Sequence, residues 1–201
     1  MSIKNHLLFV VLVGTLTSCN TVLRGLGVIK KPKVITIENM LEVGLSHGLT
    51  KEDVFYYFPS DTFNDSYSYW PEKLVEEDGF VYVFDDEGYL IEFESSCVGH
   101  PLKYLEGDVD SAMFKNAYDS ISEKVHIRDF LSLKGWDLIA AKDAMIFEDY
   151  SIQKKTVVVY WSRWQYYFTK RNIRDVTSMN LPNDSVRVLF INTDPIVEWY
   201  E

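Results

Sequence analysis

The sequence predicts an α/β domain built on a mixed β-sheet with flanking helices. The run Thr156 to Trp161 consists mainly of consecutive apolar, β-branched residues, which is typical of a central strand covered on both faces. A second buried strand is predicted at Val186 to Ile191, after a helical stretch at Trp164 to Met179. We expect these strands to pair in parallel through a right-handed βαβ crossover. With 47% hydrophobic residues the chain can form a substantial core, and residues 36–201 are expected to form one domain.

The first predicted helix covers Glu38 to Leu49. Thr36 can cap it, because its hydroxyl can accept a hydrogen bond from an otherwise unpaired amide at the helix start. Gly48 is expected to end it. The apolar residues at helical spacing are Ile37, Met40, Leu41 and Leu45. This pattern predicts that one side of the helix is buried.

A strand and a hairpin are predicted next. Val54 to Phe58 is an aromatic, β-favouring run that Pro59 is expected to end. Two further runs, Phe80 to Phe84 and Tyr89 to Phe93, flank the acidic turn Asp85-Asp86-Glu87-Gly88. Because that turn ends in a glycine, which readily adopts a positive φ angle, the two runs are predicted to form a β-hairpin.

The middle of the chain has helical patterns and one ambiguous segment. Asp110 to Ile121 is predicted to be a helix, since its apolar residues recur at helical spacing, and a shorter helix is predicted at Ile127 to Leu133. The segment Gly135 to Tyr150 fits either state, because Leu138 to Ala141 is too short an apolar run to distinguish a helix from a strand.

The N-terminal residues carry the most specific signal for localisation. An apolar run from Leu7 to Val13 follows the basic residue Lys4 and leads to Leu16-Thr17-Ser18-Cys19. The run is shorter than the ~20 apolar residues that a membrane-spanning helix needs, and its pattern is typical of a cleaved export signal. The quartet ending at Cys19 resembles the lipobox of bacterial lipoproteins.

The lipobox resemblance implies that residues 1–18 are a signal peptide and that Cys19 becomes the acylated first residue of the mature protein, carrying fatty acids such as palmitate. Residues 19–35 would form a basic tether to the membrane. The alternative is an ordinary secretory signal followed by a cysteine without a role. In the best-known sorting pattern, aspartate at the position of Asn20 favours the inner membrane. The resemblance therefore implies an outer-membrane lipoprotein of a Gram-negative cell that faces the periplasm.

Charge is divided unevenly along the chain. Five of the 20 basic residues lie before Glu38, whereas all 30 acidic residues lie from Glu38 onward. The body therefore carries a net charge of about −15, and we expect no binding to nucleic acid, which requires a basic surface. Each basic residue between Arg24 and Lys33 could gain about 1 kcal/mol beside an anionic headgroup layer. The alternative is a solvated linker.

Three segments of the body resemble parts of thioredoxin. Val157 to Phe168, VVVYWSRWQYYF, is similar to the first strand and active-site turn, where an apolar strand leads to a Trp-Cys-Gly-Pro-Cys motif at a helix start. Val186 to Pro195, VRVLFINTDP, is similar to the strand that follows, and Val81 to Phe93 to the late hairpin. Because the hairpin comes first here, the resemblance implies a permuted arrangement or two partial units in one sheet. It bears on architecture and not on activity.

The resemblance also implies that this turn is redox-inactive. With Trp164 aligned on the tryptophan of the motif, Gln165 and Phe168 stand where the two thiols would be. Disulfide exchange needs an attacking thiolate and a second, resolving thiol, and neither residue supplies one. Trp161 and Trp164 are expected to pack in the core and at its rim, the alternative being a ligand platform. We therefore expect a non-catalytic binding or scaffold module with an unknown partner in the cell envelope.

The alternative class is a thiol-dependent enzyme. Cys97 could be a nucleophile with His100 as its base, because both follow a predicted strand and a turn could bring them together. Beside a lipidated Cys19, Cys97 would have no partner for an intramolecular disulfide. A small, partly buried thiol without a role is the simpler interpretation.

We expect no cofactor and no metal site. Zinc at Cys97 and His100 would also need His47 or His126, because zinc sites use three or four protein ligands. The carboxylates of Asp85 to Glu87 could bind calcium, although an acidic turn is usually only solvated.

Overall fold

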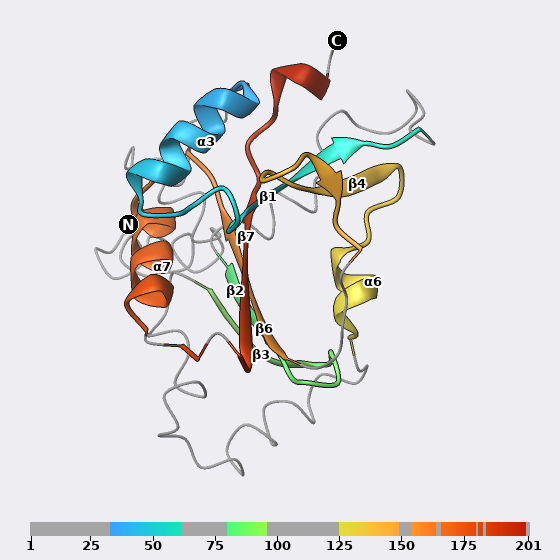
Figure 1. The fold of residues 1–201 in the computed structure, drawn as a ribbon, viewed down its shortest axis with the longest axis vertical. Coiled ribbons are helices and arrows are strands. Elements are labelled where there is room, and N and C mark those ends of the chain that lie inside the picture. The colour runs from blue at the N-terminus through green and yellow to red at the C-terminus, as the bar shows by residue number, and fades with distance from the viewer. Residues whose placement is uncertain are drawn as a thin grey trace, which may run out of the picture. The chain divides into compact units, whose positions relative to one another are not determined.

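Pro32–Glu201 form one compact unit of the computed structural model. The structure describes residues 33–61, 80–95, 125–148, 154–163, 166–179, 181–182 and 184–199 of this unit. A seven-stranded mixed sheet runs through it in the order β3-β2-β6-β7-β1-β4-β5 (Figure 1). The predicted α/β class with a mixed sheet and flanking helices is confirmed.

Parallel strands occupy the centre of the sheet and antiparallel strands its two sides. The strands are β1 (Val54–Pro59), β2 (Phe80–Phe84), β3 (Leu90–Ser95), β4 (Trp136–Ala140), β5 (Met145–Ile146), β6 (Lys155–Trp161) and β7 (Val186–Asn192). The helices are α3 (Ile37–Ser46), α6 (Ile127–Leu131) and α7 (Tyr166–Ser178), followed by the 3-10 turn η1 (Val197–Trp199). β6, β7 and β1 are parallel neighbours, so their carboxyl ends meet at one edge.

β6 is the central strand that its sequence predicts. All its residues from Thr156 to Trp161 are buried, and α7 connects it to its parallel neighbour β7. β7 is buried only from Leu189 to Asn192, whereas its first three residues are half-buried. The prediction that the whole strand is buried is therefore wrong, because its amino end leaves the exposed turn at Asp184 and Ser185.

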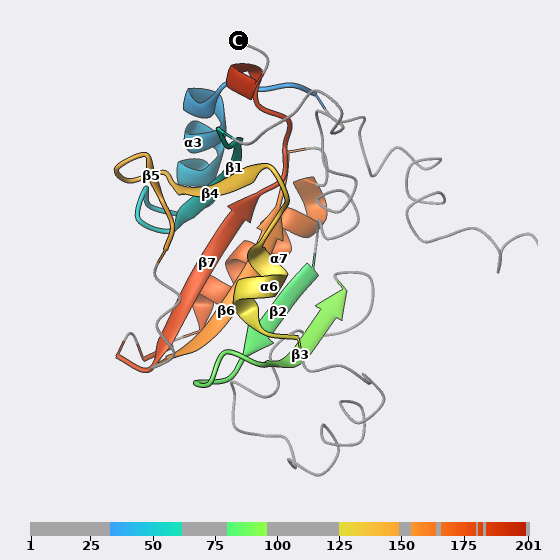
Figure 2. The same cartoon turned by 90° about the vertical axis from the view of Figure 1, so that its right-hand side faces the viewer.

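Helices lie on both faces of the sheet. α3 and α7 lie on one face and α6 on the other (Figure 1), and Figure 2 shows α6 in front of β6 and β2. A Cβ atom at Gly44 of α3 would lie 3.5 Å from the Trp161 ring. On the opposite face, the Phe130 ring of α6 contacts Tyr82, with centroids 4.6 Å apart, and lies 6.1 Å from Tyr160. Successive residues of β6 therefore pack against different layers, as alternation along a strand requires.

α3 lies where a helix was predicted, but it covers Ile37–Ser46 and ends three residues before the predicted end at Leu49. The Thr36 hydroxyl oxygen accepts a hydrogen bond from a backbone N–H of the first turn at 3.1 Å, and Gly48, just beyond the helix, has a φ of +88°. Met40 is fully buried, but Leu45 is 54% exposed. The prediction that Leu45 shares the buried face is wrong, because Gly44 faces the sheet and the next residue points away from it.

β2 and β3 form the predicted hairpin, and Gly88 has a φ of +85°. Within the turn, the Asp85 carboxylate accepts a hydrogen bond from the Tyr89 N–H at 2.7 Å. β3 begins at Leu90 rather than Tyr89, because Tyr89 instead forms an isolated bridge with His126.

β1 and β4 correct one prediction and resolve one ambiguity. Pro59 is the last residue of β1, opposite Trp136 of β4, rather than a residue outside the strand. A proline is tolerated there because the strand end needs no donor from it. The ambiguous segment from Gly135 to Tyr150 contains β4 and β5, joined by a turn at residues 141–144. Pairing with β1 favours the strand, a contact that the local sequence does not encode.

Two further predictions concern helices. α6 is two residues shorter than the predicted helix, since it ends at Leu131 instead of Leu133. Leu133 forms a bridge with Trp136, which draws the chain into β4. The helix predicted at Asp110 to Ile121 lies outside the described residues.

Candidate functional site

Buried polar residues gather where β6 and β7 end. Carboxyl ends of parallel strands are the usual ligand-binding edge of open α/β sheets, so this edge is the first place to look for a site. We call the following residues the carboxyl-edge cluster: Asn39, Ser162, Arg163, Thr169, Asn192, Thr193 and Asp194. Five of these side chains, those of Ser162, Thr169, Asn192, Thr193 and Asp194, belong to residues that are at most 2% exposed.

Asp194 joins the turn after β6 to the end of β7. One of its carboxylate oxygens accepts from the Arg163 backbone N–H at 2.8 Å and from the Asn192 side-chain amide at 3.1 Å. The Asn192 side-chain oxygen in turn accepts from the Asp194 N–H at 3.0 Å. A buried carboxylate is costly unless it receives hydrogen bonds, so this geometry stabilises both turns together.

The Trp161 carbonyl is a second junction between the two strand ends. It accepts from the Thr193 backbone N–H at 2.9 Å and from the Thr193 hydroxyl at 3.3 Å. The Asn192 side-chain amide lies 3.4 Å from the same oxygen. These contacts continue the parallel ladder of β6 and β7 past the last strand residues.

Thr169 fixes the first turns of α7 to the end of β6. Its hydroxyl oxygen accepts from the Ser162 N–H at 3.0 Å and its hydroxyl donates to the Ser162 carbonyl at 2.8 Å. Both residues have no exposed surface. The start of α7 is thus held by a reciprocal pair of bonds within the protein.

Arg163 connects the cluster to α3. Its guanidinium donates to the Asn39 side-chain oxygen, while its backbone is held by Asp194. The Arg163 residue is half-buried. A guanidinium in this position offers planar N–H donors that suit carboxylate or phosphate groups.

An entry clamp, formed by Ile35–Ile37 and Pro195–Glu198, lies at the same edge. The Ile35 N–H donates to the Pro195 carbonyl at 2.9 Å, and the Ile35 carbonyl accepts from the Val197 N–H at 2.7 Å. The Ile37 N–H, at the start of α3, donates to the Glu198 carboxylate at 3.0 Å. A carboxylate is favourable there because it faces the positive end of the helix dipole.

Tyr56 of β1 lies close enough to the clamp to respond to its charge. Burial raises the pKa of the Tyr56 phenol, and the Glu198 carboxylate raises that pKa further, because both disfavour the phenolate. Tyr56 therefore stays a neutral hydrogen-bond donor over the physiological range of pH.

The hydrogen bonds described here join the groups of the cluster to one another. They fix the shape of the turns rather than activate a nucleophile. In the described ranges, no group of three or more His, Cys, Asp or Glu side chains is arranged to hold a metal ion.

Most predicted site residues lie outside the described part of the chain. These are Cys19, Cys97 and His100, together with Trp164 and Gln165 of the turn that resembles the redox motif. The backbone of Phe168 belongs to α7. Trp161 is fully buried, so its predicted place in the core is confirmed.

The remaining candidate ligands have structural roles. The Asp85 carboxylate is used within its own turn, as described above. His126 caps α6, since its Nδ1 accepts from the Arg128 N–H at 3.2 Å. A Cβ atom at Gly88 would lie 2.7 Å from His126 Nε2, so this ring packs on the hairpin turn. His47 caps the carboxyl end of α3.

The sequence reasoning did not single out the carboxyl-edge cluster. Arg163 and Asp194 are 31 residues apart, and Asn39 is 124 residues from Arg163. The available signal was that polar residues directly follow two buried strands, at Ser162-Arg163 and at Asn192-Thr193-Asp194. Parallel pairing places such residues at one edge.

No protein-family model, curated protein or solved structure matches this chain. Among the described residues, no helix is both long enough and apolar enough to cross a membrane.

Proposed function

We propose that this chain is a lipid-anchored lipoprotein of the bacterial cell envelope whose folded unit is a non-catalytic binding or scaffold module. Leu16-Thr17-Ser18-Cys19 supports the anchor, and Asn20 supports a place in the outer membrane facing the periplasm. The basic residues up to Lys33 would strengthen attachment to anionic headgroups.

The main support for a non-catalytic module is the hydrogen bonding of the turn after β6. In the thioredoxin resemblance this turn would hold a dithiol. Here Ser162 and Arg163 are held by Thr169 and Asp194. A catalytic turn must leave a reactive group free to attack, whereas the backbone N–H groups of Ser162 and Arg163, just before the positions of the dithiol, are bonded within the protein. A rigid edge with a half-buried guanidinium suits recognition better than chemistry.

The strand order supports a permuted thioredoxin-like arrangement. The hairpin β2-β3 precedes β6 in the chain, yet β2 is the antiparallel neighbour of β6. The segments that resemble thioredoxin are therefore adjacent in one sheet, with β1, β4 and β5 added beyond β7. This adjacency supports the proposed arrangement of strands and does not bear on activity.

Fractionation of the cell envelope tests the anchor. The full chain with Cys19→Ala should leave the membrane pellet after a high-salt wash, because the acylation site is lost and the charges of the tether alone bind weakly. Cys97→Ala is the matched control and should stay in the pellet. Retention of Cys19→Ala in the washed pellet, with unchanged processing, would contradict the lipoprotein assignment.

Asn20→Asp tests the membrane assignment. If the outer-membrane assignment is right, this variant should move toward the inner-membrane fraction of a density gradient. An unchanged distribution would contradict the sorting argument and leave the anchor standing.

A thiol assay tests the module against the alternative enzyme at Cys97 and His100. The Cys19→Ala protein should not turn over insulin disulfides or peroxide with an external thiol reductant, because in the proposed module Cys97 is not a nucleophile and forms no intermediate that the reductant could resolve. Turnover that disappears in the additional Cys97→Ser variant would favour the enzyme.

A further inference from the structure

The chain enters its folded unit at a fixed point. The entry clamp holds Ile35 between Pro195 and Val197, and Ile35 forms a parallel bridge with Ile196. Ile35 is 4% exposed and Ile196 is fully buried. The clamp directly follows Asp194, so the chain enters at the same end as the carboxyl-edge cluster.

We propose that this end of the folded unit faces the lipid headgroup surface of the membrane that holds Cys19, and that the opposite end, at Asp184, points away from it. The inference rests on the proposed lipid anchor. The proposed interaction surface is the entry end of the folded unit, and its proposed partner is a layer of anionic lipid headgroups.

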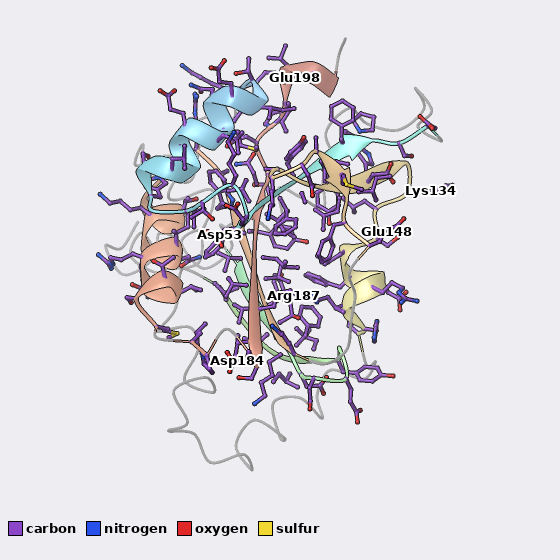
Figure 3. All side chains as sticks on the ribbon, in the orientation of Figure 1. Asp53, Lys134, Glu148, Asp184, Arg187 and Glu198 are labelled. Carbon is purple, nitrogen blue, oxygen red and sulfur yellow. The ribbon has the colours of Figure 1, made fainter. Side chains whose placement is uncertain are left out.

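The two ends are well separated. Figure 3 places Glu198, of the entry clamp, and Asp184 at opposite ends of the fold. β7 connects these regions, and its seven residues alone span about 20 Å. A probe of distance from the membrane can therefore distinguish the ends.

The length of the tether carries the argument. Lys33 lies 14 residues after Cys19, and even a fully extended chain of that length spans at most about 50 Å. A folded unit of this size is about 40 Å across. To bring the Asp184 end to the membrane, the tether would have to run along the whole unit and to be extended to most of that limit. Far fewer chain conformations allow that, so the entry end faces the membrane on average.

The exposed residues at the entry point suit a headgroup layer. Val34 is 50% exposed and adjoins the exposed Lys33. An apolar side chain beside a cation is the combination that lies favourably at a lipid interface. The exposed Glu38 and Glu42 of α3 would be repelled by anionic headgroups, so we expect contact at the entry point and not along the helix.

Energy transfer to the membrane surface tests the orientation. The lipidated full chain with Cys97→Ser would carry one donor dye, at Glu38→Cys or at Asp184→Cys. Both positions are exposed. The vesicles would contain phosphatidylethanolamine and phosphatidylglycerol with an acceptor dye on the headgroups. We expect at least twofold higher transfer efficiency from position 38 than from position 184.

A lengthened tether is the matched control. Thirty Gly and Ser residues inserted between Lys31 and Pro32 should bring the two efficiencies toward equality, because the longer chain no longer restrains the unit. Equal or reversed efficiencies in the original chain would overturn the orientation while leaving the anchor intact. A lipidated chain that does not associate with vesicles at all would overturn the anchor, and this inference with it.

Discussion

The two ends of the parallel pair β6 and β7 are held together in different ways. At the carboxyl ends, the buried side chains of Asn192 and Thr193 donate to the carbonyl of the last β6 residue, and that of Asp194 accepts from the turn after β6. At the amino ends, the Lys155 N–H donates to the Ser185 carbonyl at 3.0 Å within an exposed turn. Water can replace lost partners at the exposed end but not at the buried one. The same type of substitution should therefore cost much more at the carboxyl ends.

A charge in the middle of β6, between the two ends, should have the largest effect. Val158 has no exposed surface, and Val158→Asp places a carboxylate where desolvation costs about 4 kcal/mol or more. Because whole domains are stable by about 5–15 kcal/mol, we expect this variant to lose its cooperative unfolding transition. Circular dichroism during heating measures this. Ser185→Asp, in the exposed turn, is the control, and a Val158→Asp protein that melts within a few degrees of wild type would mean that the strand is not sandwiched.

A pair of aspartates compares the two ends directly. Asp194→Ala removes the acceptor of the Arg163 N–H and of the Asn192 amide, and should cost about 2–3 kcal/mol because the Asn192 donor stays buried and the Arg163 donor partly buried. Asp184→Ala at the exposed end should change stability by less than about 0.5 kcal/mol. Urea unfolding of both variants gives the two values. Equal losses of unfolding free energy in the two variants would contradict the claim that substitutions cost more at the carboxyl ends.

Two threonines of α7 also allow the buried and exposed ends to be compared, with smaller expected losses of stability. Thr169→Val removes the reciprocal bonds to Ser162 at the buried end and should cost about 1–2 kcal/mol. Thr177→Val removes a bond from the exposed Thr177 hydroxyl to the Ile173 carbonyl and should cost less than about 0.5 kcal/mol. If urea unfolding ranks Thr177→Val as the costlier change, hydrogen bonds at the start of α7 do not hold it to β6.

The smallest expected effect concerns pH and His47, at the far end of α3 from the carboxyl-edge cluster. Burial lowers the pKa of His47 from 6.5 in the folded state, and the nearby Lys170 charge lowers it further. The unfolded chain then binds a proton first, so this contribution to stability is complete above about pH 6.5 and is lost as the pH falls below it. Between pH 7 and 5, wild type should lose more unfolding free energy than His47→Gln. Parallel pH profiles of the two would contradict this.

Local patterns predicted the elements well, and long-range contacts explain the exceptions. The hairpin turn, β6, α7 and the Thr36 cap each depend on a few consecutive residues. Leu45 and Pro59 were misassigned because a neighbouring strand or helix decides which residue is buried or paired. The local sequence of Gly135 to Tyr150 fits either a helix or a strand, and the pairing of β4 with β1 decides for the strand.

The candidate site was beyond sequence reasoning for the same reason. Arg163, Asn39 and Asp194 come from three distant parts of the chain, and only the register of β6 against β7 and the position of α3 bring them together. Polar residues after buried strands indicated an edge but not which side chains would meet there.

The sequence by itself determined the α/β class, the alternation of strands and helices around β6, and the charge division between the segment before Glu38 and the body. These depend on composition and on periodicity, which are properties of neighbouring residues. Only the tertiary structure decided that the polar ends of β6 and β7 close on each other, that Leu45 is exposed, and that the entry clamp joins Ile35 to Ile196. Each of these depends on packing between residues far apart in the chain, whose contacts become favourable only when the whole sheet forms.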